Sequence, residues 1–215
     1  MSHDSDLKTQ VLAELEWEPS LSAAHIGVTA HDGVITLSGH VQRFSEKHAA
    51  EAAARRVRGV KAVAEVIEVK LPFDVQRSDE DIATAAISRL AWDTSVPADS
   101  VKVTVENGWV TLHGEVEWHF QHYAVEQDVR RLWGVVGVSN HIKITSPVNT
   151  ANLSDNIDRA LHRSWFDPKS VKVSATGGKV KLTGTVDSWT HRVLAGSTAW
   201  AAPGATSVEN DLVIG

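Results

Sequence analysis

Apolar and polar residues alternate along three short segments, and each segment begins with a turn dipeptide. The segments read DGVITLSG at 32–39, NGWVTLHG at 107–114 and GGKVKLTG at 177–184. Asp-Gly, Asn-Gly and Gly-Gly allow positive φ at both central residues of a two-residue hairpin turn. A second alternating run precedes each turn, at 26–30, 101–105 and 171–175. The pattern predicts three β-hairpins, and therefore three copies of one small domain.

Apolar residues spaced four apart precede each hairpin and predict a helix with one buried face. They are Leu7, Val11 and Leu15, then Ile82, Ala86 and Leu90, then Ile157, Leu161 and Trp165. A second helix follows each hairpin and stops near Gly59, Gly134 or Gly204, and a third alternating strand comes after it. Each repeat is therefore predicted as helix–strand–strand–helix–strand, or αββαβ, with modules at 3–72, 77–147 and 152–215.

The charge and the composition exclude several classes of protein. The net charge of −6 divides unevenly, with −2 over residues 4–72, −5 over 78–147 and +1 over 154–215. No module is basic enough for a nucleic-acid partner. The chain has no cysteine, and the polar, acidic start MSHDSDLKTQ lacks the pattern of a signal peptide. No apolar run reaches the roughly 20 residues of a transmembrane segment, so the sequence predicts a soluble, cytoplasmic protein.

The repeated phrase itself resembles the BON domain. Its copies are GVITLSGHV, GWVTLHGEV and GKVKLTGTV, followed by VSNHI at 138–142 and VENDL at 208–212. The first module departs from the pattern, because Glu65 stands where the others have Asn140 and Asn210. The resemblance implies an α/β fold of the α+β sandwich type, with two helices against a three-stranded mixed sheet in each module.

The resemblance also implies a function. BON modules occur in osmotic-stress and envelope proteins and are regarded as non-enzymatic modules that bind phospholipid or other proteins. We therefore expect a non-catalytic stress-response protein with a phospholipid or protein partner. One relative that pairs a BON module with a second domain binds potassium in the cytoplasm, so a small-ligand or potassium sensor is the alternative.

Eight tryptophans are many for this chain, and comparison of the repeats sorts them. Four occupy positions where a sister module has a polar or charged residue, which favours an interface over the core: Trp109, Trp118, Trp133 and Trp200. They are candidates for partner binding, although contacts between the modules themselves explain the same positions and are the simpler interpretation. Trp165 is expected in the core, and Trp17 and Trp92 are expected to pin the loop after the first helix.

Basic residues gather where the second helix of module one ends: Arg55, Arg56, Arg58 and Lys61. They could complement the helix dipole or bind a phospholipid headgroup. In the third module, residues 193–202 carry no charge, which predicts a helix packed on both sides.

Catalytic and metal-binding patterns are weak. His119 and His122 are three residues apart, a spacing that could share one ion, but no third ligand lies at a useful distance in the sequence. No nucleophile elbow, P-loop or dinucleotide fingerprint occurs. The sequence therefore predicts no metal, no cofactor and no enzymatic activity.

Overall fold

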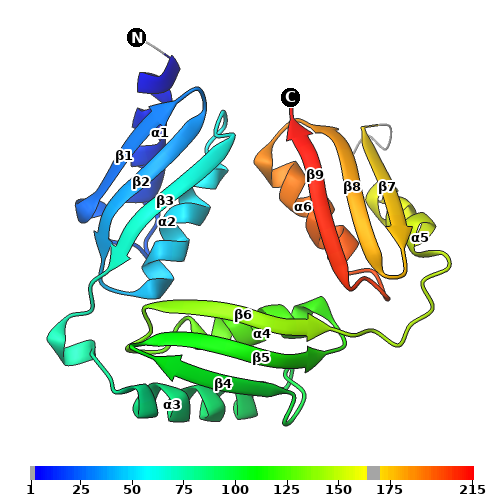
Figure 1. Ribbon diagram of the computed structural model, residues 1–215. Coiled ribbons are helices and arrows are strands. Elements are labelled where there is room, and N and C mark those ends of the chain that lie inside the picture. The colour runs from blue at the N-terminus through cyan, green and yellow to red at the C-terminus, as the bar shows by residue number, and fades with distance from the viewer. Residues whose placement is uncertain (1–2, 164–169) are drawn as a thin grey trace. The chain divides into compact units, whose positions relative to one another are not determined.

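The computed structural model describes residues 3–163 and 170–215, and it contains the predicted order of elements three times (Figure 1). The first module consists of α1 (His3–Trp17), a short 3-10 turn η1 (Ala23–His25), β1 (Ile26–His31), β2 (Val34–Val41), α2 (Phe44–Arg56) and β3 (Ala62–Val69). A second 3-10 turn, η2 (Phe73–Val75), lies between this module and the next. The second module consists of α3 (Asp79–Trp92), β4 (Val101–Glu106), β5 (Trp109–Val116), α4 (His119–Val129) and β6 (Gly137–Ile144). The third consists of α5 (Leu153–His162), β7 (Val171–Thr176), β8 (Lys179–Val186), α6 (Trp189–Trp200) and β9 (Ser207–Ile214).

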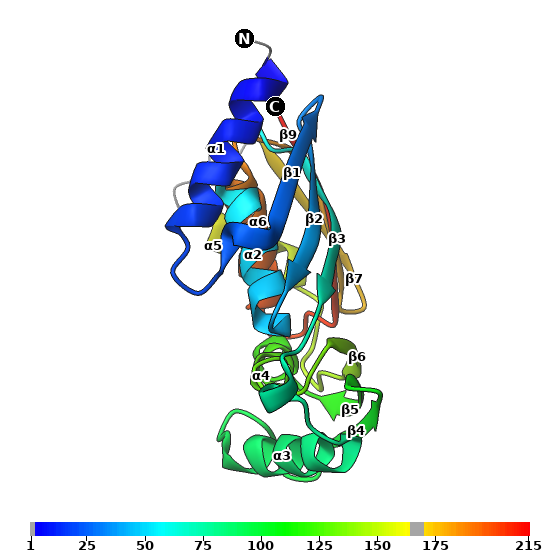
Figure 2. The same cartoon turned by 90° about the vertical axis from the view of Figure 1, so that its left-hand side faces the viewer.

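Each module contains one three-stranded sheet, with orders β1-β2-β3, β4-β5-β6 and β7-β8-β9. In the first and third sheets, the hairpin strands pair antiparallel and the last strand joins the central one in parallel. The parallel pairing requires a crossover, which α2 and α6 supply. Figure 2 shows α1 and α2 together on one face of the first sheet. The α+β sandwich expected from the sequence is confirmed.

The buried residues are those that the spacing of apolar residues predicted to lie in the core. In the first module, Leu7, Val11 and Leu15 of α1 pack with Ile35 and Leu37 of β2, and all five are buried. The third module repeats this core with Ile157, Leu161, Val180 and Leu182. The position of Trp165, which was expected in this core, lies outside the described residues. Burial of these apolar side chains is the main stabilising term of each small sandwich.

Glycine is required at two places in the repeated phrase. Both central residues of each hairpin turn have positive φ, as the dipeptides predicted; Asp32 and Gly33, for example, have φ of 50° and 84°. The glycine that ends the phrase also has positive φ and lies against the start of the preceding strand. A Cβ there would come within 2.0 Å of a carbonyl oxygen at Gly39 and Gly114, and within 1.9 Å at Gly184.

The described residues group into two compact units. The first holds the residues up to Arg89 together with Thr104–Thr111 and Asp128–Ser139. The second holds Leu90–Val103, Leu112–Gln127 and the residues from Asn140 onward. The division passes through the second module, so each unit contains one outer module and part of the middle one.

Candidate functional site

None of the four candidate tryptophans is fully buried, but each has specific neighbours. The indole of Trp109, at the start of β5, is 49% exposed and lies over Gly137 of β6, where a Cβ would be 2.4 Å from the ring. Its Nε1 donates a hydrogen bond of 2.9 Å to the Ser139 hydroxyl. Trp109 therefore covers its own sheet with one face and exposes the other.

Trp133 follows α4 and is also 49% exposed. The guanidinium of Arg43, just before α2, lies 4.6 Å from the centroid of its ring. Cation–π contacts of this kind contribute about 0.5–1 kcal/mol at exposed sites. Both residues belong to the first compact unit. This contact supports the explanation that Trp133 joins neighbouring modules, although the residue remains about half exposed.

Trp200, at the end of α6, stacks on His119 at the start of α4 with 4.1 Å between ring centroids. Burial lowers the pKa of the His119 imidazole below its ordinary value of 6.5, and the neighbouring His122 lowers it further. Burial likewise lowers the pKa of His122. Trp118 lies nearby in the sequence, partly buried, with its ring 6.5 Å from that of Phe120. Trp200 thus makes an intramolecular contact, within the second compact unit.

The expectation for Trp17 and Trp92 was wrong. They stand at the last residue of α1 and α3, and their side chains are 84% and 87% exposed instead of pinning the following loop. The helical register explains this, because Leu15 and Leu90 are the last residues on the buried face and a residue two positions later points away from it. These two equivalent, exposed rings are candidates that the sequence interpretation missed.

The expectation that α6 is packed on both sides was also wrong. Ala195, Gly196 and Ala199 are buried, whereas Val193 and Leu194 are 53% and 39% exposed. A stretch without charges therefore presents small residues to its sheet and larger apolar ones to the solvent.

The basic residues at the end of α2 do not form one open cluster. Arg55 forms an ion pair with Glu51, one helical turn earlier. Arg56 forms two ion pairs, at 2.8 Å with Glu14 of α1 and at 2.9 Å with Glu18, which follows α1. The hydrogen bonds of these two ion pairs raise the pKa of Arg56. Arg58 is exposed, and the Lys61 side chain lies against the hairpin turn at Gly33. Two of the four charges are thus occupied by carboxylates of the same module.

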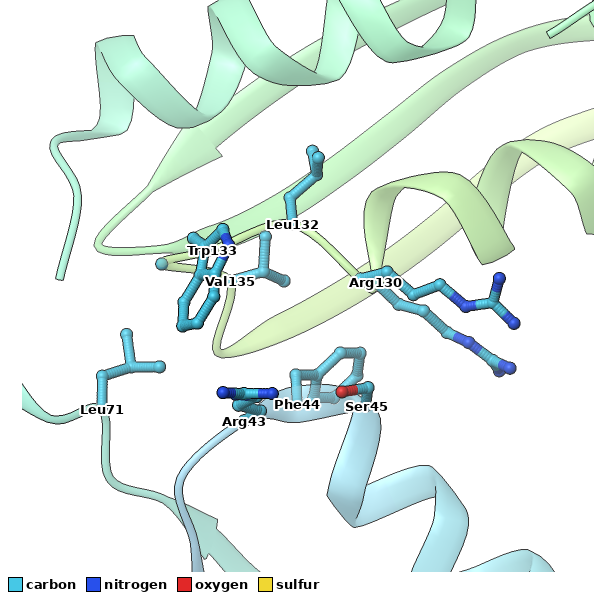
Figure 3. A pocket seen from close by; sticks show the side chains of 10 residues that line it. Arg43, Phe44, Ser45, Leu71, Arg130, Leu132, Trp133 and Val135 are labelled. Atoms are coloured by element: carbon cyan, nitrogen blue, oxygen red, sulfur yellow. The ribbon is translucent and has the colours of Figure 1, made fainter. Parts of the chain in front are cut away.

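Other arginines border a pocket of about 140 Å³ in the first compact unit (Figure 3). Residues at the start of α2, together with Leu71 after β3, form one wall of the pocket. Residues of the segment that follows α4 form the other wall. The lining residues are Arg43, Phe44, Ser45, Leu71, Arg130, Arg131, Leu132, Trp133, Gly134 and Val135. Figure 3 shows Arg43 beside Trp133, while Arg130 extends away from that ring. Three guanidiniums and no carboxylate line this pocket.

These three arginines differ from Arg55 and Arg56 in their electrostatic surroundings. Among the described residues, no ion pair joins Arg43, Arg130 or Arg131 to a carboxylate. The contact of Arg43 with the Trp133 ring is a cation–π contact and uses no carboxylate, so it does not neutralise the guanidinium charge. No local sequence pattern indicates this site, because Arg43 lies 87 positions before Arg130 and only the fold brings them to one pocket.

A wider groove lies in the third module between α5 and the end of α6. Arg159 and Arg163 stand on one side of it, and Ala201, Ala202 and Pro203 on the other. Arg159 already donates to the Asp155 carbonyl and to the Asn156 side chain. The groove therefore offers fewer available donors than the pocket beside Trp133.

The fold and the sequence together define the class of protein. The BON domain family matches the sequence three times, at residues 3–70, 78–146 and 149–215. The chain belongs to the BON-domain family.

Among curated proteins, the chain is 30% identical over 144 residues to "Osmotically-inducible protein Y" of Escherichia coli (strain K12), covering 65% of this chain and 72% of that protein. It thus belongs with BON proteins of the osmotic-stress type. Two solved structures of CdsD, a structural protein of the type III secretion system of Chlamydia trachomatis, also match. They are 18% and 17% identical with TM-scores of 0.27 and 0.26, cover 97% of this chain, and are themselves covered to 92% and 97%. Similarity at this level supports no functional comparison.

Within the described residues, no helix is both long enough and apolar enough to cross a membrane. The comparisons give no support to the cytoplasmic location expected from the sequence, which stays a prediction.

Proposed function

We propose that this BON protein is a non-catalytic stress-response protein that docks peripherally on a phospholipid surface. In this proposal the modules 3–72, 77–147 and 152–215 form the scaffold, and the pocket bordered by Arg43, Arg130 and Arg131 receives an anionic headgroup. The observation that carries it is the presence of three arginines without carboxylate partners along one pocket that also holds Trp133, in a chain whose net charge is −6.

The chemistry of the pocket suits a phosphate ester. Guanidinium groups bind phosphate oxygens in bidentate fashion, and they are more weakly hydrated than ammonium groups. Leu71 and Trp133 supply an apolar and an aromatic wall beside the arginines. Aromatic side chains with one polar edge are favoured where an apolar phase meets water.

The overall acidity of the protein does not prevent this binding. Charges farther away than about 10 Å are largely screened at an ionic strength near 0.1 M. Local arginines therefore decide the interaction at contact, while the acidic second module lowers the rate of approach to an anionic surface. We expect weak binding that increases as the anionic lipid content rises and falls as salt is added.

Flotation with liposomes tests the proposal. The wild-type protein should float with vesicles that contain phosphatidylglycerol and not with pure phosphatidylcholine. Arg43→Gln and the double variant Arg130→Gln/Arg131→Gln should each lose most of the flotation. The single controls Arg56→Gln and Arg58→Gln each remove one charge elsewhere, as Arg43→Gln does, and should float like the wild type. Equal losses in all four variants, or no flotation at low salt, would contradict the proposal.

Protein docking is the second candidate, and it is supported by the exposure of Trp17 and Trp92 at equivalent positions. Large aromatic side chains commonly anchor protein interfaces. A photoreactive phenylalanine analogue at position 17 or 92 should crosslink a partner in osmotically stressed cells, and the same probe at the exposed Ser20 should not. Crosslinks from all three positions alike would count against a specific partner.

The potassium alternative stays a prediction with its own test. A ligand that binds the native state alone raises the unfolding midpoint. Under the lipid proposal, thermal unfolding in potassium and sodium chloride of equal ionic strength should give the same midpoint, whereas a higher midpoint in potassium would favour the sensor. The proposal assigns no reaction, cofactor or nucleic-acid partner to the protein.

A further inference from the structure

Two pairs of histidines that are not neighbours in the sequence have stacked rings. His25 ends η1 and His40 lies near the end of β2. Because Ile26 pairs with Gly39 in the antiparallel hairpin, the residues one step further out, His25 and His40, stand opposite one another. Their ring centroids are 4.7 Å apart, and the ring planes differ by 12°.

The second pair lies in the second module. His113 is in β5 and His141 in β6, adjacent strands of the sheet, and the ring centroids are 5.3 Å apart with planes 21° apart. The equivalent positions in the other modules are directly paired, as Ser38 with Val66 and Thr183 with Asp211. Both histidines are exposed, so their imidazoles lie on the solvent-facing side of the sheet.

The fold does not require histidine at any of these positions. Where the first module has His25 and His40, the other two have Ser100 with Glu115 and Ser170 with Thr185. Where the second module has His113 and His141, the sister modules have the serine, valine, threonine and aspartate just described. Each pair is thus a feature of one module, and packing of the shared core does not explain it.

Paired imidazoles suit a transition-metal ion. A neutral imidazole nitrogen binds zinc at about 2.0–2.1 Å, so two nitrogens on one tetrahedral ion lie about 3.3 Å apart. The recorded rings are stacked, so both side chains must rotate about χ1 and χ2 to point one nitrogen each at a shared ion. Imidazole favours zinc, copper and nickel, whereas calcium and magnesium prefer oxygen ligands.

We propose that His25 with His40, and His113 with His141, each chelate one divalent transition-metal ion. Each site supplies two nitrogens. Among the described residues, no histidine, cysteine, aspartate or glutamate forms a group of three that could hold a metal, so water fills the remaining positions. The sites are therefore accessible and exchange their ion readily. The proposal is independent of the headgroup pocket, because it shares no residue with it.

Calorimetric titration of the full chain with zinc chloride, in a buffer that does not bind metal, tests the inference. The wild type should bind two ions, His40→Gln and His141→Gln should each bind one, and the double variant should bind none at concentrations that saturate the wild type.

Two variants serve as controls for this titration. His31→Gln removes an exposed histidine beside Asp32, and His122→Gln removes one partly buried on α4. Both controls should still bind two ions. Unchanged binding in the double variant, or an equal loss in either control, would overturn the inference. Circular dichroism of each variant verifies that the fold is retained, as expected for changes at exposed or half-exposed positions.

Discussion

The side-chain amide of Asn210 donates a hydrogen bond of 2.8 Å to the backbone carbonyl of Arg192, and so ties β9 to α6. The Asn210 carbonyl oxygen in turn accepts from the N–H of Leu212. Asn140 makes the equivalent bond to the carbonyl of His122 at 3.2 Å. The asparagine of the repeated VxN phrase is therefore a clamp between the last strand and the second helix.

Replacing this clamp should destabilise the third module. Asn210→Ala removes the side-chain hydrogen bonds to the Arg192 carbonyl and from the Leu212 N–H in a partly buried place, which should cost about 1–2 kcal/mol of unfolding free energy. Urea unfolding followed by circular dichroism measures it. The neighbouring Glu209→Ala, at an exposed position, should change stability by less than about 0.5 kcal/mol. Equal effects of the two changes would show that the clamp contributes nothing.

The glycine at the end of the repeated phrase should tolerate no side chain. Gly184→Ala places a Cβ 1.9 Å from the Ser170 carbonyl oxygen at a φ of +129°, so the hairpin must shift. We expect a loss of about 2–4 kcal/mol. Gly177→Ala is the matched control, because φ is also positive there but nothing lies within 4 Å of the added Cβ. It should cost about 1 kcal/mol of unfolding free energy, the usual penalty for a Cβ in the left-handed region. Comparable losses at both positions would contradict the close approach.

Stability should depend on pH through the stacked His119. Its pKa is lowered in the folded state, so the unfolded chain binds more protons just below the ordinary value of 6.5. Stability is then complete above that pH and decreases as pH falls through the window between the unfolded and folded pKa. Unfolding free energies at about pH 7.5 and 5.5 should differ less in His119→Gln than in the wild type. An unchanged difference would contradict the assignment.

Replacing an exposed tryptophan should change the unfolding free energy less than replacing the half-packed Trp109. Trp17→Ser and Trp92→Ser remove rings with few neighbours and should change the unfolding free energy by less than about 0.5 kcal/mol. Trp109→Ser removes both the Ser139 hydrogen bond and the contact with Gly137, and should cost about 1–2 kcal/mol. A loss of that size at Trp17 would mean that its ring is packed after all.

The fold could be predicted in detail because the same pattern of apolar residues and turn dipeptides occurs three times in the sequence. Alternation placed Ile35, Leu37 and their counterparts in the core, and the turn dipeptides located the hairpins. The sequence also identified Glu65 as a departure, and the structure gives its consequence. Lys47 takes the place of His122 and Arg192, and its ammonium group lies 3.0 Å from the Glu65 carboxylate. An ion pair thus connects helix and strand where the other modules use an amide.

The candidate sites could not be predicted in the same way, because they depend on contacts between residues far apart in the chain. No local pattern connects Arg43 with Trp133, or His113 with His141. Arg55 and Arg56 were more conspicuous in the sequence, yet the carboxylates of Glu51, Glu14 and Glu18 occupy them. Alignment of the repeats shows that His113 and His141 are equivalent to Ser38 and Val66. Only the strand register reveals that these two positions are paired, so the histidine pair could not be recognised from the alignment alone.

The indole N–H signal of Trp133 tests the central claim most directly. It can be assigned in the nuclear magnetic resonance spectrum with a Trp133→Phe variant and followed during titration with phosphatidylglycerol bicelles. If the pocket binds a headgroup, the Trp133 signal shifts in the wild type and stays in place in Arg130→Gln/Arg131→Gln, and the signals of Trp17 and Trp92 change little. Shifts at Trp17 and Trp92 with an unmoved Trp133 signal would contradict the account.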